Sequence, residues 1–312
     1  MKHLIFIVVL FFSCNFLIAQ DANFSQYNNA RTYTNPAFAG SDSTLVIATG
    51  YRLEWPKING GFRTFHFSAD QYVPFLKGGI GIDYINDNEE KGTLIKSKIN
   101  INYAPHFELF KHKIVVQPAI CIGFFQKSLD WSKLTFGDMI DERRGYVYNT
   151  NEQQHLSSIM GIDFSAGLLV YGSNFYGGVA AYHLTEPNEG LMGPSNLPMR
   201  ITLHGGVNLD FNTKLFLLSP TILLMKQANF QMLMPGVTAK YKWAVLGISY
   251  RSGDAFIINI GFQNRFLKFG YSYDYTISTL PDKITGGTHE VQLAWFLHYQ
   301  KKVCRIKTLR LI

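Results

Sequence analysis

The chain has 312 residues, of which 47% are hydrophobic, 15% aromatic and only 16% charged, with a formal net charge of +7. The charged share lies well below the ~25% that is usual for soluble domains. Lys2 and the five basic residues of 300–312 account for six of the seven net positive charges. The basic excess therefore lies at the two ends of the chain, which argues against a nucleic-acid-binding groove.

Residues 1–19 have the order of a secretory signal: a basic start, an apolar run over 4–12 and a small residue, Ala19, at the expected cleavage point. A membrane anchor is the alternative, but the run is short for a span of ~20 residues and no basic flank follows it. Cys14 is a poorer candidate for a lipoprotein site, because apolar residues continue beyond it. We therefore expect an exported protein with a signal peptide over 1–19.

Alternation with a period of two residues recurs along most of the chain after the expected signal. In 94–103, for example, isoleucines at 95, 99 and 101 alternate with lysines and asparagines, so that one face of a strand is apolar and the other polar. The segments are about ten residues long, near the ~9–11 that cross a bilayer as a tilted strand. Glycines and polar residues on the second face suit a barrel lumen, and aromatic residues gather near segment ends, as in an aromatic girdle.

The pattern predicts an all-β protein, a transmembrane antiparallel β-barrel of about 14 strands over 44–299. A single-chain bacterial barrel closes with an even number of strands. Pro118 and Pro220 lie within predicted strands and remove a ladder donor, so we expect a bulge or a strand end at each. The predicted strands are 44–53, 61–71, 77–86, 93–104, 113–125, 159–171, 175–184, 199–210, 214–226, 230–241, 243–252, 255–264, 266–277 and 287–299.

Two segments flank the predicted barrel. In the N-terminal segment, 20–43, Asn35-Pro36 starts a turn, and the small residues after it permit a close backbone approach. We expect this segment to pack at or in the barrel, with a flexible leader as the alternative. Residues 300–312 form a basic C-terminal tail. Connections are tight at some strand ends and long at others, the longest being 127–154 and then 185–198; long loops on one side are typical of outer-membrane barrels.

Enzymatic signatures are missing from the sequence. Cys121 and Cys304 are the only cysteines after the expected signal, and they form no Cys-x-x-Cys pair. The nine histidines show no His-x-x-x-His or His-Glu-x-x-His spacing. We expect no enzyme, no cofactor and no metal. A barrel hydrolase is the remote alternative, and it would need a histidine within hydrogen-bond reach of a serine or an aspartate at the outer rim.

Several short runs go beyond a generic barrel pattern. In chain order they are Phe24-Ser25-Gln26-Tyr27, Asn35-Pro36-Ala37-Phe38-Ala39-Gly40, Tyr51-Arg52-Leu53-Glu54-Trp55-Pro56, Leu129-Asp130-Trp131-Ser132, Phe136-Gly137-Asp138, Tyr250-Arg251, Tyr271-Ser272-Tyr273-Asp274-Tyr275 and His289-Glu290-Val291. In that order and spacing, the chain resembles the PorP/SprF family of Bacteroidetes outer-membrane proteins over residues 20–299. Glu54 replaces the usual Gln of the family's Arg-x-Gln-Trp run, and the basic tail is a second departure.

The resemblance implies an outer-membrane protein of, or associated with, the type IX secretion system. Such a protein helps to export a secreted partner, such as a large adhesin, or to hold it at the cell surface, including in gliding motility. A small-solute pore is the alternative. We expect partner contacts from Trp131, Phe136 and Tyr146 in the long loop, because exposed aromatic residues are common binding anchors.

The remaining candidates are structural, and outer-membrane lipid is the other expected partner. Arg52 should face inward and pair with a carboxylate such as Asp83 or Glu54; a structural ion pair is weighed there against ligand recognition. The candidate structural residues of the motif runs are Asn35, Pro36, Tyr51, Arg52, Trp55, Tyr273 and Asp274.

Overall fold

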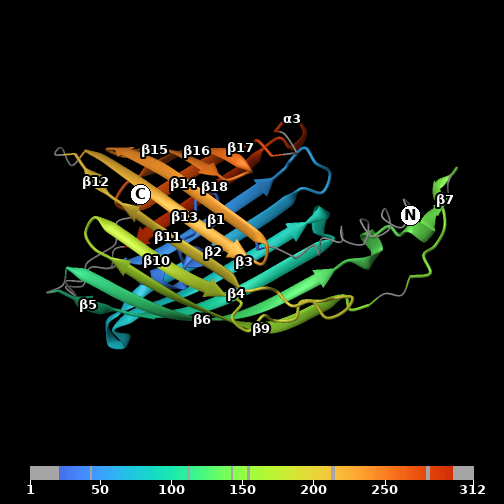
Figure 1. Cartoon of the computed structure of the whole chain (residues 1–312), viewed down its shortest axis with the longest axis horizontal. Helices are drawn as coiled ribbons and strands as arrows, with labels where there is room; N and C mark the ends of the chain where they lie inside the picture. Colours follow the sequence, from blue (N-terminus) through green and yellow to red (C-terminus); the bar gives the residue numbers. More distant parts are fainter. Residues whose placement is uncertain are drawn as a thin grey trace, which may run out of the picture.

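The computed structural model describes residues 21–42, 44–110, 113–141, 143–152, 155–211, 215–278 and 282–297. The expected signal peptide and basic tail lie outside the described residues. Most of the described chain forms long strands that run obliquely around one barrel (Figure 1). None of the described helices is long and apolar enough to cross a membrane.

Two short helical segments precede the strands, and others lie in the connections. The helical segments are α2 (Arg31–Thr34), η1 (Pro36–Phe38), η2 (Pro74–Leu76), η3 (Glu90–Gly92), η4 (Trp131–Lys133), η5 (Gly137–Met139) and α3 (Asp282–Thr285). The strands are β1 (Leu45–Glu54), β2 (Phe62–Val73), β3 (Gly78–Glu89), β4 (Leu94–Pro105), β5 (Phe107–Leu109), β6 (Ile114–Leu129), β7 (Ile140–Asp141), β8 (Gly145–Tyr146), β9 (Ser158–Tyr171), β10 (Phe175–Tyr182), β11 (Arg200–Val207), β12 (Leu209–Asp210), β13 (Phe216–Gln227), β14 (Phe230–Tyr241), β15 (Ala244–Arg251), β16 (Ala255–Gln263), β17 (Leu267–Thr276) and β18 (Thr288–Leu297).

The sheet closes on itself. Its long strands pair antiparallel with their neighbours in the chain, and β1 pairs with β18 over ten residue pairs from Leu45↔Leu297 to Glu54↔Thr288. Of the sixteen strands in this sheet, β5 and β12 have only three and two residues, which leaves fourteen long strands in the wall. The predicted barrel of about 14 strands is therefore confirmed, and closure leaves no unpaired sheet edge for lipid to cover.

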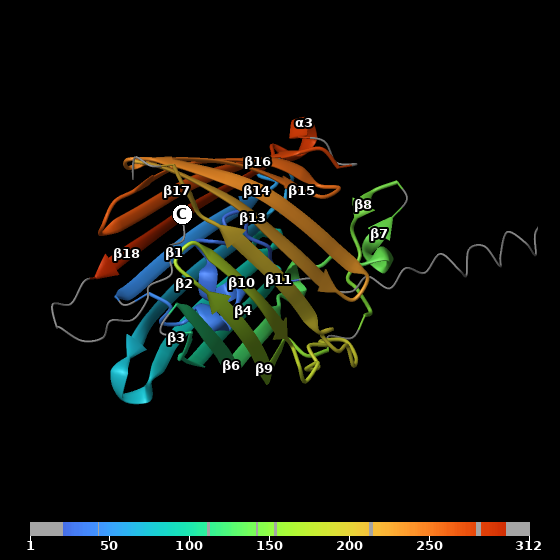
Figure 2. The same cartoon turned by 60° about the vertical axis from the view of Figure 1, so that its left-hand side comes forward.

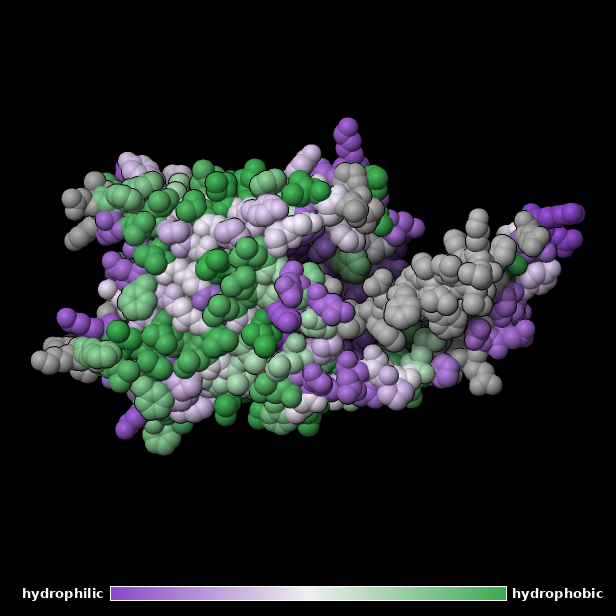
Figure 3. Space-filling view, in the orientation of Figure 1, coloured by the Kyte–Doolittle hydropathy of each residue, from purple (hydrophilic) through white to green (hydrophobic). Residues whose placement is uncertain are grey.

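The alternation in the sequence separates the outer wall from the lumen. In β3, Ile80 and Ile82 are each 44% exposed on the outer wall. Asp83, the residue after Ile82, faces the lumen and is 1% exposed. Figure 3 shows hydrophobic residues spread over the barrel wall and hydrophilic residues gathered towards one end. Tyr171 and Tyr176 lie at strand ends, as the aromatic residues of a girdle would. They are instead buried in the lumen, where they belong to a core cluster with Phe38 of the N-terminal segment.

The two ends of the barrel differ. The connections 130–157 and 183–199 lie at one end, here called the loop end, together with the short β7–β8 hairpin, which stands beyond the wall (Figure 1 and Figure 2). The opposite end, here called the turn end, has short connections such as 172–174 and 242–243. In outer-membrane barrels the long loops lie outside the cell and the short turns face the periplasm.

Neither of the two strand prolines ends its strand. Pro118 stays paired with β9, but the ladder from β6 towards β4 stops at Tyr103↔Ile120 and resumes, through β5, at Phe107↔Val116. Pro220 lies in the same kind of interruption between the β11 and β12 pairings of β13. The register is kept across both gaps, so the missing N–H groups cost a few ladder bonds and not the strand.

Candidate functional site: the barrel lumen and the outer loop

Residues 21–42 contact lumen-facing side chains along the length of the barrel. Asp21 lies near the loop end, where Arg200 Nη1 is 3.1 Å from its carboxylate. Ala39 lies near the turn end, where its carbonyl accepts a hydrogen bond of 2.6 Å from Gln117 Nε2. Between these points most of the segment is buried, including α2, which Figure 2 shows within the ring of strands. The hydrogen bonds of this segment thus reach strands on many sides of the lumen.

Ser25 is the centre of a charged cluster in the loop-end half of the lumen. Its hydroxyl donates to Asp274 Oδ2 at 2.5 Å and accepts from Arg52 Nη1 and Arg251 Nη2, each at 2.6 Å. Its backbone N–H donates to Glu290 Oε2 at 2.7 Å. Arg52 also lies 3.2 Å from Asp274 and 3.1 Å from Glu290, which are almost fully buried. Two arginines and two carboxylates therefore contact one serine of the N-terminal segment.

The predicted partners of Arg52 are only partly correct. Arg52 does pair with Glu54, at 3.2 Å. The Arg52–Asp83 pair is wrong: the carboxylate of Asp83 accepts instead from Thr32 and Asn102. Asp83 lies on β3, two strands away from β1 in the sheet, whereas closure of the barrel places β18 with Glu290 directly beside β1.

Arg31 and Asn35 fix the middle of the segment. Arg31 Nη2 lies 2.9 Å from both carboxylate oxygens of Asp70, and the Gly40 N–H donates to the same carboxylate at 2.8 Å. The Asn35 side chain accepts from Ala37 N–H at 2.9 Å and caps η1, which Pro36 begins. It also donates to the carbonyls of Leu168 and Val179 at 3.1 and 3.2 Å. Asn35 thus joins the turn to β9 and β10.

Glycines of the wall make room for these contacts. A Cβ on Gly79 would overlap the carbonyl of Ala39, and one on Gly167 would overlap Asn35 Oδ1. Likewise, a Cβ on Gly270 would overlap Gln26 Oε1. The three glycines lie on β3, β9 and β17, on different sides of the barrel. Their lack of a side chain is what lets the N-terminal segment lie against the strands.

A second charged cluster surrounds Asp21. His183 lies between two carboxylates, with Nδ1 2.7 Å from Asp163 and Nε2 2.6 Å from Asp21. Lys98 Nζ is 2.5 Å from Asp163. His183 therefore lies within hydrogen-bond reach of aspartates, as the hydrolase alternative requires. However, its side chain is 2% exposed, both ring nitrogens face carboxylates, and its hydrogen bonds in the described chain go to no serine hydroxyl. Nor does any group of three or more His, Cys, Asp or Glu side chains among the described residues form a metal site.

The other predicted structural residues lie at the loop end of β1 and β17. Tyr51 is 45% exposed on the outer wall. Trp55 turns the chain after β1, with a φ of 56° and its ring 5.7 Å from that of Phe62. Tyr273 points outward and donates to Asp282 at 2.7 Å, whereas Asp274 points into the Ser25 cluster. Of the candidate structural residues that lie far apart in the chain, Arg52 and Asp274 are brought into direct contact.

Ser25, Arg251 and Glu290 were not among the predicted site residues, although each lies in one of the motif runs. In each run, a polar residue at an inward position of the alternating pattern could have indicated a lumen contact. The charges of Arg251 and Glu290 fit an inward ion pair, but their partner could not be chosen from the sequence.

The long outer loop has an internal anchor and an exposed tip. Trp131 is only 7% exposed, stacks on Phe136 at 6.4 Å and lies near His155. It therefore holds the loop together, and its predicted role as a partner contact is corrected. Tyr146, in the β7–β8 hairpin, is 66% exposed. In the same hairpin, hydrogen bonds from Arg143 N–H, Tyr148 OH and Arg144 N–H hold the pKa of Asp141 below its usual range.

A closed antiparallel barrel with an apolar outer wall and a polar lumen defines the chain as a β-barrel membrane protein. Residues 17–295 match the family model described as type IX secretion system membrane protein PorP/SprF. The chain therefore belongs to the PorP/SprF family, as the motif runs predicted, and it is an outer-membrane protein.

Comparison with solved structures finds other outer-membrane barrels. The chain is similar to Omp33 of Acinetobacter baumannii, with 7% identity, 83% of this chain and 100% of that chain covered, and a TM-score of 0.48. It is also similar to a deletion mutant of the monoaromatic hydrocarbon channel TodX, with 10% identity, coverage of 87% and 94%, and a TM-score of 0.47. Likenesses this distant carry no argument about function. A comparison with curated proteins finds no match.

Proposed function

We propose that this barrel serves the type IX secretion system as a docking scaffold, which helps to export a secreted partner such as a large adhesin or to attach it at the cell surface. In this role the partner binds the outer loop and does not pass through the lumen. The observation that carries the proposal is the exposed tip of that loop.

The tip of the loop combines a defined shape with exposed apolar side chains. Its hairpin is held by the β7–β8 pairing and by Asp141, which accepts from Tyr148 at 2.9 Å. Tyr146, Val147 and Tyr148 are 66%, 49% and 53% exposed. The β7–β8 hairpin, which ends at Tyr146, stands beyond the barrel end in Figure 2. Contiguous exposed apolar residues on a part of the molecule that lipid does not cover are typical of a protein contact.

The contents of the lumen favour a docking scaffold and argue against a small-solute pore. The polar groups that would line a channel are instead bonded to residues 21–42, as the clusters around Ser25 and Asp21 show. Bulky side chains such as Tyr171 and Phe38 pack between the segment and the wall. A solute would have to displace these contacts to pass.

The test replaces Tyr146, Val147 and Tyr148 together by serine in the full-length chain. The matched control replaces three exposed apolar residues of the turn end, Phe107, Leu109 and Phe110, which are 54%, 45% and 73% exposed. Proteins held at the cell surface and proteins released into the medium are then quantified in cells that carry each variant.

We expect the loop variant to release a type IX secreted protein that the wild type and the control retain. Immunoblots of outer membranes confirm that both variants insert equally. Unchanged surface retention in the loop variant would overturn the proposal.

A further inference from the structure

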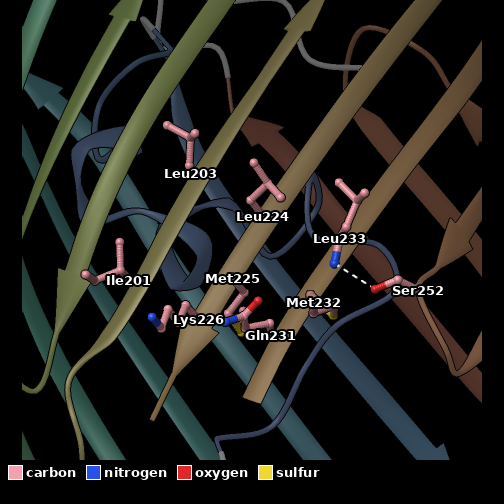
Figure 4. A pocket seen from close by; sticks show the side chains of 9 residues that line it. All are labelled: Ile201, Leu203, Leu224, Met225, Lys226, Gln231, Met232, Leu233 and Ser252. Atoms are coloured by element: carbon pink, nitrogen blue, oxygen red, sulfur yellow. Dashed lines mark hydrogen bonds between the residues drawn. The ribbon is translucent and has the colours of Figure 1, made fainter. Parts of the chain in front are cut away.

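A groove of about 470 Å³ lies on the outer wall near the loop end (Figure 4). Its apolar part is a row of three leucines on adjacent strands, because the register pairs Leu203 with Leu224 and Leu224 with Leu233. All three face outward and are 38–50% exposed. The lining residues are Ile201, Leu203, Leu224, Met225, Lys226, Gln231, Met232, Leu233 and Ser252.

One end of the groove is polar. The same register places Lys226 beside Gln231 in the next outward row, two residues closer to the loop end than the leucines. Both side chains are exposed, and Lys226 forms no ion pair with any residue in the part of the chain that the structure describes. The groove therefore offers an apolar body and one unpaired cation at its outer end.

The groove exists because two neighbouring hairpins differ in length. The β14–β15 ladder stops at Gly236↔Ser249, where Pro235 lacks an N–H, while β13 and β14 continue to their turn. Ser252, in the β15–β16 turn, closes one side by exchanging hydrogen bonds of 2.9 and 3.0 Å with the backbone of Leu233. The taller β13–β14 hairpin thus stands beside a lower turn, which leaves a step in the wall.

The step lies where the outer wall changes from apolar to polar. Tyr250 and Tyr275 point outward on the neighbouring strands, each next to Phe256 in the ladder. Outward tyrosines mark the headgroup level of a membrane. Ser252 lies opposite Leu233, so Tyr250 is two residues nearer the turn end than the leucine row. The leucine row therefore borders the headgroup level, where acyl chains and headgroups meet, and Lys226 lies on its headgroup side.

We propose that this groove is a lipid site: it binds an acyl chain of one outer-leaflet lipid, whose anionic headgroup pairs with Lys226. The charge of the occupant follows from the lone cation at the polar end, and its apolar part follows from the leucine row. Met225 and Met232 alternate with the outward leucines, and their side chains pack in the lumen with Tyr27 and Leu223. The leucines therefore supply the apolar surface of the groove.

The experiment uses the full-length protein in detergent and native mass spectrometry. The probes are phosphatidylglycerol and phosphatidylcholine with identical acyl chains. We expect the wild type to retain one phosphatidylglycerol under conditions that remove phosphatidylcholine. Lys226→Gln should lower this retention about fivefold, the effect of one lysine at an anionic surface. Lys242→Gln, which removes an exposed lysine at the turn end, is the control and should change nothing.

A second variant tests the apolar part. Leu224→Trp fills the groove and should lower retention of phosphatidylglycerol below that of the wild type, while heat-modifiable mobility on gels confirms that each variant is a folded barrel. Equal retention of the two lipids by the wild type, or equal losses in Lys226→Gln and Lys242→Gln, would overturn the proposal. Loss of a secreted partner from cells with Leu224→Trp, without a change in lipid retention, would assign the groove to a protein instead.

Discussion

Arg52 and its neighbours show how residues far apart in the chain become partners in the lumen. The Arg52 side chain is 2% exposed and contacts Ser25, Asp274 and Glu290. The carboxylates of Asp274 and Glu290 are also buried. A buried ion pair contributes little net stability, but removing one partner leaves a buried charge uncompensated. The Ser25 cluster is therefore a place where a single substitution has a large effect.

We predict that Arg52→Met lowers the free energy of unfolding by about 3–5 kcal/mol, because Asp274 and Glu290 lose a cation in a buried site. Chemical denaturation in detergent micelles measures this change. The control is Arg63→Met on β2, where the arginine is exposed on the outer wall, and little effect is expected. Equal midpoints for the two variants would show that the cluster does not hold the N-terminal segment.

At the scale of elements, the alternation of residue types was enough to predict all fourteen wall strands and which side chains face inward. It did not predict pairing across the closure. Asp83 or Glu54 was expected to pair with Arg52, and Glu54 does. The third carboxylate partner, Glu290, lies 238 residues away and becomes a neighbour only because β18 closes on β1. Trp131 was expected to be exposed because it lies in a loop, but the loop has a small packed centre of its own.

A second prediction concerns the close contact between the N-terminal segment and the barrel wall. Gly167→Ala should displace Asn35, because the new Cβ would overlap its side-chain oxygen and lie 3.1 Å from Pro36 Cγ. We expect a loss of about 1–3 kcal/mol and faster protease cleavage within residues 21–42. Gly177→Ala is the control, since the nearest atom to its new Cβ outside the adjacent residues, the His204 carbonyl oxygen, would be 3.9 Å away. Unchanged cleavage in Gly167→Ala would contradict the close approach.

At the scale of the whole molecule, the central claim is that this barrel is a closed scaffold and not a pore. Conductance in planar lipid bilayers tests the claim most directly, with a variant that lacks residues 21–42 as the positive control. We predict that the wild type adds no steady conductance and that the deletion opens a channel of constant size. A steady conductance of the same size in both proteins would contradict the account and favour the small-solute pore.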